Sequence, residues 1–389
     1  MAELEALTAL LDAAVEGGIP AAQSCVLRAG RIAHRSAHGS RGSGQAVNLE
    51  SLFDVASVTK AAATTTLAAV FVSRGMLDLD ALVPDYLGLP APAVSVRSLL
   101  AHGSGFPPWA PLFASADFPE GAHRVRRLEV ALRTTRFSRA RAHIIDAVLR
   151  TPPEHTPGRR AYSDLGFITL GAVLEKVGGA RLDELFEAAV LAPLGLEGPR
   201  FFDLSDDLPS GPEIIPTGVT RPREPAPGQE TLYGVPDQDE AEDPGEVDDD
   251  NAWAMGGIAG HAGLFATAGH LARIGRAWLE EIHGAERLGA GDALRLFARP
   301  DTTTSGAERG LGFDRPTGPQ STAGPSFGRT GPLGAIGHLG FTGCALWVDL
   351  DREIVAALVT NRVRPGRAHV SGIRALRPAF FETAWRGLT

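Results

Sequence analysis

Two apolar stretches near the end of the chain, residues 342–350 and 353–360, are separated only by Asp351 and Arg352. Apolar runs of this length with so short a polar break are typical of neighbouring antiparallel strands. Another strand pattern lies near the start of the chain, where residues 24–39 contain two short strands around a turn. Because strands are expected at both ends, the sequence predicts one sheet to which both ends of the chain contribute.

The rest of the chain is mainly helical in pattern. Residues 1–18 predict an opening amphipathic helix. Further helices are expected where apolar residues recur at helical spacing, at residues 57–73, 128–133, 142–150, 165–176, 268–282 and 372–386.

These elements predict an α/β protein of the α+β type, with an antiparallel sheet flanked by helices and a helical insertion. We expect a discontinuous sheet domain of residues 1–60 and 251–389, and a mainly helical domain of residues 61–250. The helical domain includes residues 203–250, which are rich in Pro, Gly and acidic residues. We expect this excursion to be a long, solvated surface loop and the least ordered part of the chain.

The charge composition argues against a polyanionic partner. The formal net charge is −9, and nine carboxylates lie in residues 237–250, so the rest of the chain is balanced. Seven arginines lie between Arg124 and Arg141. Their spacing fits a solvated helix surface, and no set of aromatic residues for stacking on bases interleaves them, so we expect no nucleic acid partner.

The sequence shows no membrane span and no metal motif. Residues 1–18 carry acids where a signal peptide carries bases, and the longest uncharged apolar stretch, residues 61–72, is too short to cross a bilayer. We therefore expect a cytoplasmic protein. Cys25 and Cys344 are the only cysteines, which excludes a disulfide scaffold or a CxxC metal site. The eleven histidines form no HxH or HExxH motif, so we expect no metal and no other cofactor.

Ser57 and Lys60 stand three residues apart at the start of the apolar stretch expected to be a buried helix. Side chains at this spacing are neighbours on a helix, so the hydroxyl and the amine can share a proton. The N–H of Ser57, in the first turn, has no intrahelical acceptor and can stabilise negative charge. The chain contains two lysines, Lys60 and Lys176, beside 35 arginines. Because an ammonium can lose its proton and a guanidinium cannot, a lysine at position 60 favours proton transfer over a mere positive charge.

Tyr162 and Asp164 lie in a loop that precedes the helix expected at residues 165–176. A tyrosine placed there can approach the Ser57–Lys60 pair, and a neighbouring ammonium would lower its pKa and make it a candidate general base. A structural interpretation stays open, with Tyr162 as a half-buried aromatic and Asp164 as the N-cap of the helix.

Three glycines surround His338 in residues 337–343, at the entrance to the apolar strand expected at residues 342–350. Glycines in a strand pattern indicate a close approach of another backbone or of a ligand, so a substrate is expected along this edge. A glycine-rich bend with His338 as an incidental surface histidine is the alternative.

Residues 324–328 match the GxSxG pattern of a nucleophile elbow, which requires a strand before and a helix after the serine. The sequence Gly-Arg-Thr-Gly-Pro follows, and it is incompatible with a helix at that point. Ser326 is therefore not expected to be a nucleophile.

The motifs SVTK at residues 57–60, YSD at 162–164 and HLG at 338–340 occur in this order along the chain. Together they resemble the serine β-lactamase and penicillin-binding protein family, in particular its class C-like branch, which also contains esterases and D-amino-acid peptidases. Further stretches similar to that branch are LLAHGSGFPPW from Leu99, DDNAWAMGGIAGHAGLF from Asp249, and NRVRPGR. The resemblance covers nearly the whole chain except about residues 205–245.

The resemblance implies the fold of the β-lactamase and transpeptidase proteins, with the active site between the sheet and the helical domain. It also implies that Ser57 is the acylated nucleophile and Lys60 its proton partner. Tyr162 would be the base that later protonates the leaving group. The N–H groups of Ser57 and of Phe341, which follows Gly340, would form the oxyanion hole.

Three positions depart from the pattern of the penicillin-recognising members. His338 replaces a lysine, which makes the local charge depend on pH and weakens anion binding near neutrality. Leu339 replaces a hydroxyl residue that helps to hold a carboxylate, and Asp164 replaces an asparagine. Asp164 is expected to hold Lys60 protonated, which leaves Tyr162 as the base.

These departures favour an uncharged ester or amide over a β-lactam. We expect a serine hydrolase that forms an acyl-enzyme on Ser57, most simply a carboxylesterase acting on a small-molecule ester or amide. A D-amino-acid peptidase or weak β-lactamase, and a non-catalytic binding module on the same scaffold, remain alternatives. The sequence gives no indication of the oligomeric state.

Overall fold

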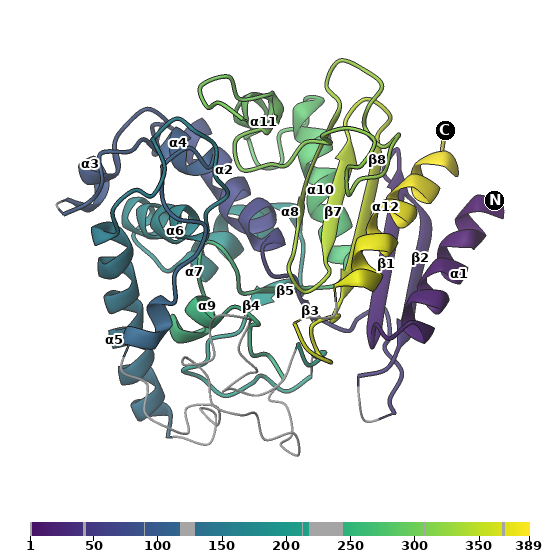
Figure 1. Ribbon diagram of the computed structural model, residues 1–389, viewed down its shortest axis with the longest axis horizontal. Helices are drawn as coiled ribbons and strands as arrows, with labels where there is room; N and C mark the ends of the chain where they lie inside the picture. The colour runs from purple at the N-terminus through teal and green to yellow at the C-terminus, as the bar shows by residue number, and fades with distance from the viewer. Residues whose placement is uncertain are drawn as a thin grey trace.

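The strands at the two ends of the chain form one antiparallel sheet in the computed structural model (Figure 1). The structure describes residues 2–41, 44–88, 90–116, 129–211, 213–217, 244–306, 308–367 and 370–389. The strand order is β2-β1-β8-β7-β6. The strand bounds are β1 Ala21–Arg28, β2 Arg31–Gly39, β6 Ala335–Leu339, β7 Ala345–Asp349 and β8 Ile354–Thr360. The predicted sheet is confirmed, with β1 next to β8 in its centre.

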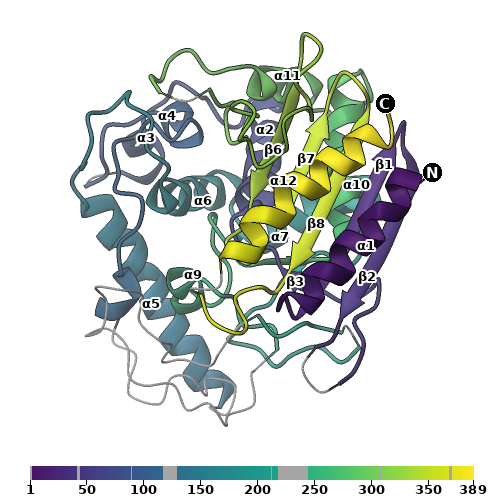
Figure 2. The same cartoon turned by 45° about the vertical axis from the view of Figure 1, so that its right-hand side comes forward.

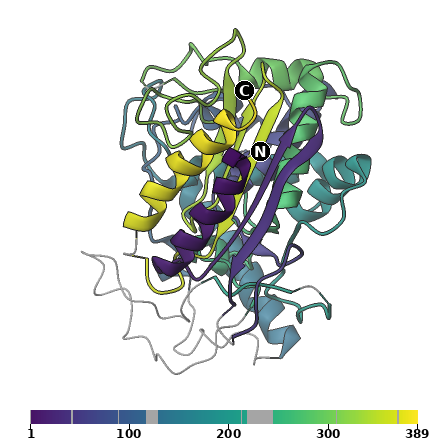
Figure 3. The same ribbon diagram turned by 90° about the vertical axis from the view of Figure 1, so that its right-hand side faces the viewer.

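Helices cover both faces of this sheet (Figures 2 and 3). The helices α1 (Ala2–Glu16) and α12 (Ser371–Arg386) lie side by side on one face, and α10 (Ala268–Ile282) lies on the other. The apolar residues at helical spacing along α12 are buried: Ile373, Leu376, Phe380 and Ala384. The layered arrangement hides the apolar face on each side of the sheet.

The helix α10 begins where the sequence predicts. The Thr267 side chain accepts from the His270 N–H, and the His270 side chain accepts from the Thr267 N–H, which satisfies two free donors of the first turn. Gly275 lies against the sheet, where a Cβ would come within 2.9 Å of both Val348 and Val355. The glycine therefore allows the helix to approach β7 and β8 closely.

The helical part lies beside the sheet, on the left of Figure 1. Its α-helices are α3 Val83–Leu87, α4 Val96–Leu100, α5 Val130–Arg150, α6 Asp164–Gly178, α7 Leu182–Phe186, α8 Ala192–Leu194 and α9 Asp250–Ala254. The short helices η2 Leu112–Ser115 and η4 Glu187–Leu191 belong to it as well. Between the two parts run η1 Lys60–Thr65 and α2 Thr66–Ser73, while α11 Gly291–Ala298 packs on α10 and α2.

A small second sheet, which the sequence did not predict, joins three distant segments. Its strand order is β3-β5-β4, with β3 at Phe53–Asp54, β5 at Leu264–Ala266 and β4 at Arg200–Phe201. All three strands are too short to produce a periodic pattern. The sheet matters for the site because β3 ends three residues before Ser57.

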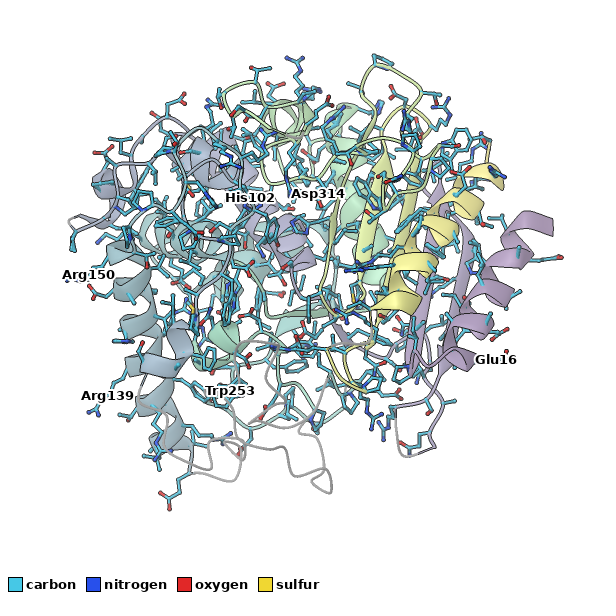
Figure 4. All side chains as sticks on the ribbon, in the orientation of Figure 1. Glu16, His102, Arg139, Arg150, Trp253 and Asp314 are labelled. Carbon is cyan, nitrogen blue, oxygen red and sulfur yellow. The ribbon has the colours of Figure 1, made fainter. Side chains whose placement is uncertain are left out.

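The helices predicted at residues 128–133 and 142–150 are one continuous helix, α5. Phe137, Ala140 and Ile144 are buried at helical spacing, so the apolar stripe crosses the arginine-rich stretch that suggested a break. The expectation of a solvated arginine face was wrong in part. Arg133 is 1% exposed and pairs with Asp207, whereas Arg139 projects into solvent (Figure 4). Arg124, Arg126 and Arg127 lie outside the described residues.

The prediction of a solvated loop for residues 203–250 was wrong at both ends, while residues 218–243 lie outside the described residues. Leu204, Ile215 and Val247 are buried in the main core. Asp248 and Asp250 are also buried. Both pair with Arg367, which compensates for the loss of water around their charges. Part of the acidic stretch expected in solvent is therefore buried, and its partner, Arg367, lies more than a hundred residues later in the chain.

Within the described ranges, no helix combines the length and the apolar character that crossing a bilayer demands.

Candidate active site

Ser57 lies in a turn directly after β3. At the end of β3, three residues earlier, the Asp54 carboxylate accepts a hydrogen bond of 2.8 Å from the Ala56 N–H. Ala56 has a φ of 48°, in the left-handed region that non-glycine residues seldom adopt. We predicted Ser57 inside the first helical turn, but it precedes the helix, and its carbonyl accepts from the Lys60 N–H at 3.1 Å. As an N-cap residue, Ser57 still leaves its own N–H without an intrahelical acceptor.

Lys60 is fully buried, and its ammonium has several polar partners. Its ammonium donates to Ser57 Oγ at 2.8 Å and to the carbonyl oxygen of His261 at 3.0 Å. Its Nζ also lies 2.7 Å from Asp164 Oδ1. Burial lowers the pKa of Lys60, but the Asp164 carboxylate and then the Tyr162 oxygen raise it by more, so the pKa lies above its ordinary value. The pair predicted from the SxxK spacing is thus in contact, and Asp164 stabilises its charged form.

Tyr162 lies over this pair. The Lys60 Nζ is 5.0 Å from the centre of the Tyr162 ring. Burial raises the pKa of the phenol above its ordinary value, although the nearby ammonium and hydrogen bonds with Lys60 and Ser57 oppose that rise, so the expected lowering of this pKa was wrong. The structural alternative for Asp164 was wrong in detail, because Ser163 caps α6 by accepting from the Gly166 N–H at 3.3 Å. Asp164 is therefore available to Lys60.

His338 belongs to β6, a separate strand, rather than to the entrance of the strand expected at residues 342–350. The His338 ring is 2% exposed, and its Nδ1 lies 2.7 Å from the Leu339 carbonyl oxygen, which can only accept. Burial lowers the pKa of His338 to about 4, and the charge of Arg309 contributes to that shift. The expectation of a pH-dependent charge near neutrality was wrong, because this ring is neutral over the physiological range.

Gly340 brings the end of β6 against the segment that leads to Ser57. A Cβ at this position would lie 2.3 Å from the Val55 carbonyl oxygen, so only glycine permits the approach. The next residue, Phe341, is half exposed. Its N–H belongs to the same peptide group as the Gly340 carbonyl. In the part of the chain that the structure describes, neither the Ser57 N–H nor the Phe341 N–H donates to a protein acceptor. Two unpaired donors at one site are what an oxyanion hole requires.

Ser57 opens into a cavity of about 620 Å³ between β6 and the helical part. Its large apolar lining residues are Trp109, Leu339 and Phe341. Its charged lining residues are Asp164, Asp248, Asp249, Asp314, Arg309, Arg367 and Arg377. Figure 4 shows Asp314 where the helical part meets the sheet. No group of three His, Cys, Asp or Glu side chains in the described ranges is arranged to hold a metal ion.

Comparison with known proteins then decides the family. Residues 7–379 match the family described as Beta-lactamase, which is almost the whole chain. The chain belongs to the β-lactamase family. It is a serine hydrolase of that family, and the predicted fold class is confirmed.

Relatives and solved structures agree with this assignment. A protein of Escherichia coli named "Putative D-alanyl-D-alanine carboxypeptidase" is 26% identical over 373 residues, which cover 90% of this chain and 80% of the relative. The fold is shared with a penicillin-binding protein homologue from Caulobacter crescentus, with a TM-score of 0.66, 19% identity and coverage of 99% and 98% of the two chains. EstCE1, described as a hydrolase with promiscuous acyltransferase activity, has the same fold at a TM-score of 0.63, with 21% identity and 97% and 98% coverage.

The sequence did not predict several polar groups around this β-lactamase-family site. His102 stacks on Tyr162 with ring centres 4.5 Å apart, and its Nδ1 accepts from the Ser163 N–H at 3.1 Å. Burial lowers the pKa of His102 well below its ordinary value, so its ring adds no charge beside the phenol. In the sequence, His102 lies in the stretch from Leu99 that resembles the family, but that resemblance assigns no role to His102.

His261, whose carbonyl oxygen accepts from Lys60, has an acidic partner for its side chain that the sequence does not indicate. Its Nε2 lies 2.8 Å from Asp249 Oδ1. Burial raises the pKa of Asp249, but His261, the Ala252 N–H and Arg367 together lower it by more, so the pKa lies below its ordinary value. Asp249 and His261 are twelve positions apart, which corresponds to no metal-ligand spacing, and their contact depends on the turn after α9.

Proposed function

We propose that this serine hydrolase cleaves small, uncharged carboxylic esters through an acyl-enzyme on Ser57. The observation that carries the proposal is the chain of contacts from Ser57 Oγ to Lys60 Nζ to Asp164, at 2.8 and 2.7 Å, beside two unpaired backbone donors. A hydroxyl with a proton partner and a place for negative charge has the parts that acyl transfer needs.

The reaction begins when the Tyr162–Lys60 pair has lost one proton. Because Lys60 donates to Ser57 Oγ, the hydroxyl proton of Ser57 is left for the Tyr162 oxygen, with which Ser57 forms a hydrogen bond. As Oγ bonds to the substrate carbonyl carbon, that proton passes to Tyr162. The electron pair of the carbonyl bond moves to the oxygen, which faces the N–H groups of Ser57 and Phe341.

Collapse of this intermediate breaks the bond to the alcohol, which leaves with the proton held by Tyr162. Water then attacks the acyl-enzyme while Tyr162 takes a proton from it. The acid departs as Ser57 Oγ regains a proton from Tyr162, so the site returns to its starting state.

The charges around the cavity support an uncharged substrate. Arg309 pairs with Asp314, and Arg367 pairs with Asp248 and Asp250. Arg377 is engaged with backbone carbonyl oxygens. His338 is neutral. The Leu339 side chain offers no hydrogen-bond donor, and it packs against the apolar residues between the sheet and the helices α1 and α12. A substrate carboxylate would have to displace these partners, which costs binding energy.

A D-amino-acid peptidase is the second candidate, because the Escherichia coli relative carries the carboxypeptidase name quoted above. The same cavity would then hold a peptide amide in place of the ester. The two candidates differ in which acyl donor leaves a group on Ser57.

Active-site labelling tests the proposal. The purified protein is treated with a fluorophosphonate probe and, separately, with panels of p-nitrophenyl esters, D-amino-acid amides and β-lactams, and intact mass records any adduct. We expect a single phosphonyl adduct, mapped to the peptide that contains Ser57, and ester turnover with a transient acyl adduct. Acylation only by D-amino-acid amides would favour the second candidate, while a heat-unfolded sample controls for non-specific labelling. Absence of label on the folded protein would reject an acyl-enzyme mechanism.

Asp164→Asn is expected to move the alkaline rise of kcat/KM to lower pH. The Asp164 carboxylate raises the pKa of both Lys60 and Tyr162. Replacing the carboxylate by an amide lowers both pKa values. The Tyr162–Lys60 pair that has lost one proton is then more populated at neutral pH. We expect a shift of about one to three pH units, as for other pairs in contact.

The measurement is a pH–rate profile for a p-nitrophenyl ester, corrected for spontaneous hydrolysis. Asp314→Asn is the matched control, since Asp314 lines the same cavity but is not among the groups that shift the pKa of Lys60 or Tyr162. A rise that stays in place, or moves to higher pH, in Asp164→Asn would contradict the assigned proton pair.

A further inference from the structure

The turn between β6 and β7, residues 340–344, has every carbonyl oxygen engaged. The Gly340 oxygen accepts from the Gly343 N–H at 3.0 Å, and the Cys344 oxygen accepts from the Gly340 N–H at 2.7 Å. The Phe341 oxygen accepts from Arg362 Nε at 2.9 Å, and the Thr342 oxygen accepts from the Thr360 hydroxyl at 2.8 Å. The Phe341 N–H, in contrast, is left for the cavity.

Arg377 of α12 reaches three of these carbonyl groups. Its guanidinium donates to the oxygens of Gly340, Gly343 and Cys344, at 3.3 Å for Gly343 and 2.8 Å for Cys344. The contact with Gly340 is the informative one. The Gly340 carbonyl and the Phe341 N–H are the two ends of a single peptide group, so the guanidinium holds one end while the other end faces the substrate.

No carboxylate of the described residues lies within ion-pair distance of Arg377, although the side chain is largely removed from water. Burial lowers the pKa of Arg377 to about 10, which leaves the guanidinium charged at neutral pH. A partly buried cation without a counter-ion destabilises the free protein. Negative charge that develops next to it during the reaction would be stabilised.

We propose that Arg377 is a positioning residue of the oxyanion hole. Its guanidinium fixes and polarises the Gly340–Phe341 peptide group, so that the Phe341 N–H is aimed at the substrate oxygen and donates more strongly to it. This role rests on the function proposed above, since it requires that Ser57 attacks a carbonyl group.

Two physical effects support this role. A hydrogen bond from a charged donor polarises an amide group, and this strengthens the hydrogen bond at the other end of the same amide. In addition, the turn cannot rotate the Phe341 N–H away from the cavity while Gly340, Gly343 and Cys344 are held together by one rigid, planar group. Both effects act on the transition state, so they should appear in kcat more than in KM.

Arg377→Met and Arg377→Lys test the role, with Arg374→Met as the matched control. Arg374 lies one turn earlier on the same helix and is exposed, so its replacement removes an equal charge without touching the turn. We measure kcat and KM on a p-nitrophenyl ester, the rate of fluorophosphonate labelling, and the affinity for an aryl boronic acid, which forms a tetrahedral adduct with the serine. Thermal unfolding reports on the fold.

For Arg377→Met we expect a fall in kcat of about ten- to a hundred-fold, less than the loss of an oxyanion donor itself causes. The labelling rate and boronate affinity should fall by a similar factor, with KM within about three-fold. Arg377→Lys should recover part of the loss because the charge remains, and Arg374→Met should behave as wild type.

Two results would overturn the inference, and they are distinguishable. If the wild type is labelled and Arg377→Met is labelled equally fast, Arg377 merely holds the turn and the proposed function stands. The same conclusion follows if the loss appears in KM and thermal stability while boronate affinity is unchanged. If the folded wild type is not labelled at all, the proposed function fails and this role fails with it.

Discussion

Ser57→Ala is expected to reduce ester hydrolysis by more than about 10⁴-fold and to leave the fold intact. The loss follows because the Lys60 ammonium donates to Ser57 Oγ at 2.8 Å, while the Tyr162 phenol, with which Lys60 also forms a hydrogen bond, is the assigned base. Alanine removes one atom without adding volume, and Ser57 is partly exposed at the cavity, so thermal stability should stay within a few degrees. The measurement is initial-rate kinetics on a p-nitrophenyl ester, with unfolding followed by circular dichroism.

Ser326→Ala is the matched control, because Ser326 lies in the GxSxG-like stretch, residues 324–328, and is not expected to be a nucleophile. The Ser326 hydroxyl donates to Glu382 at 2.9 Å, and neither residue lines the cavity. This variant should hydrolyse esters at the wild-type rate. Turnover that survives in Ser57→Ala, or that disappears in Ser326→Ala, would show that the nucleophile is assigned wrongly.

Lys60→Arg is expected to reduce kcat/KM by about 10³-fold, within the range for loss of a proton-transfer group. The positive charge persists, but a guanidinium does not release a proton in this pH range, so the Tyr162–Lys60 pair cannot share one proton between two sites. Lysine is also fully enclosed at this position, and the longer side chain has to displace Ser57 or Asp164. Ester kinetics and the fluorophosphonate labelling rate should fall together.

Lys176→Arg provides the comparison, since Lys176 is the only other lysine and lies exposed in the last turn of α6. It should retain wild-type kinetics. Because Lys60→Arg can lower stability through overpacking, Lys60→Met is measured beside it, and its unfolding temperature shows whether a folded protein has lost activity. A folded Lys60→Arg variant with near wild-type rates would reject proton transfer by this amine.

The sequence predicts well those parts of the site that depend on neighbours in the chain. Ser57 and Lys60 meet because they are three positions apart on a helical turn, and Asp164 is near Tyr162 because the two are two positions apart. The strand pair 345–349 and 354–360 follows from its apolar runs and short polar break. In each case the physical cause acts over fewer than about twenty residues, so it leaves a local pattern.

Other parts of the site leave no such pattern. The carbonyl oxygen that accepts from Lys60 belongs to His261. Arg377 reaches the turn between β6 and β7 from α12. Any residue offers a carbonyl group, and an arginine on a helix has the same sequence signature whether it faces solvent or a turn. These contacts exist only once the tertiary fold is complete.

The helix that follows Ser57 shows the same limit. After the α-helical residues Val58 and Thr59, it continues as the π-helical segment η1, Lys60–Thr65, and is α-helical again from Thr66. The composition KAAATT predicts an ordinary helix. A wider turn just after Lys60 changes the direction of the following side chains, and π-helical turns are frequent at functional sites. Packing against distant segments, including the Thr64 hydroxyl bonded to the Gly260 carbonyl, selects it.

The order of strands in the main sheet has a consequence for biosynthesis. β1 pairs with β8, so about 330 residues of polypeptide must leave the ribosome before the first hairpin gains its neighbour. Until then β1 presents an unpaired, apolar edge, which is a template for association with other nascent chains. Production of this protein should therefore benefit from slow expression or chaperone supply.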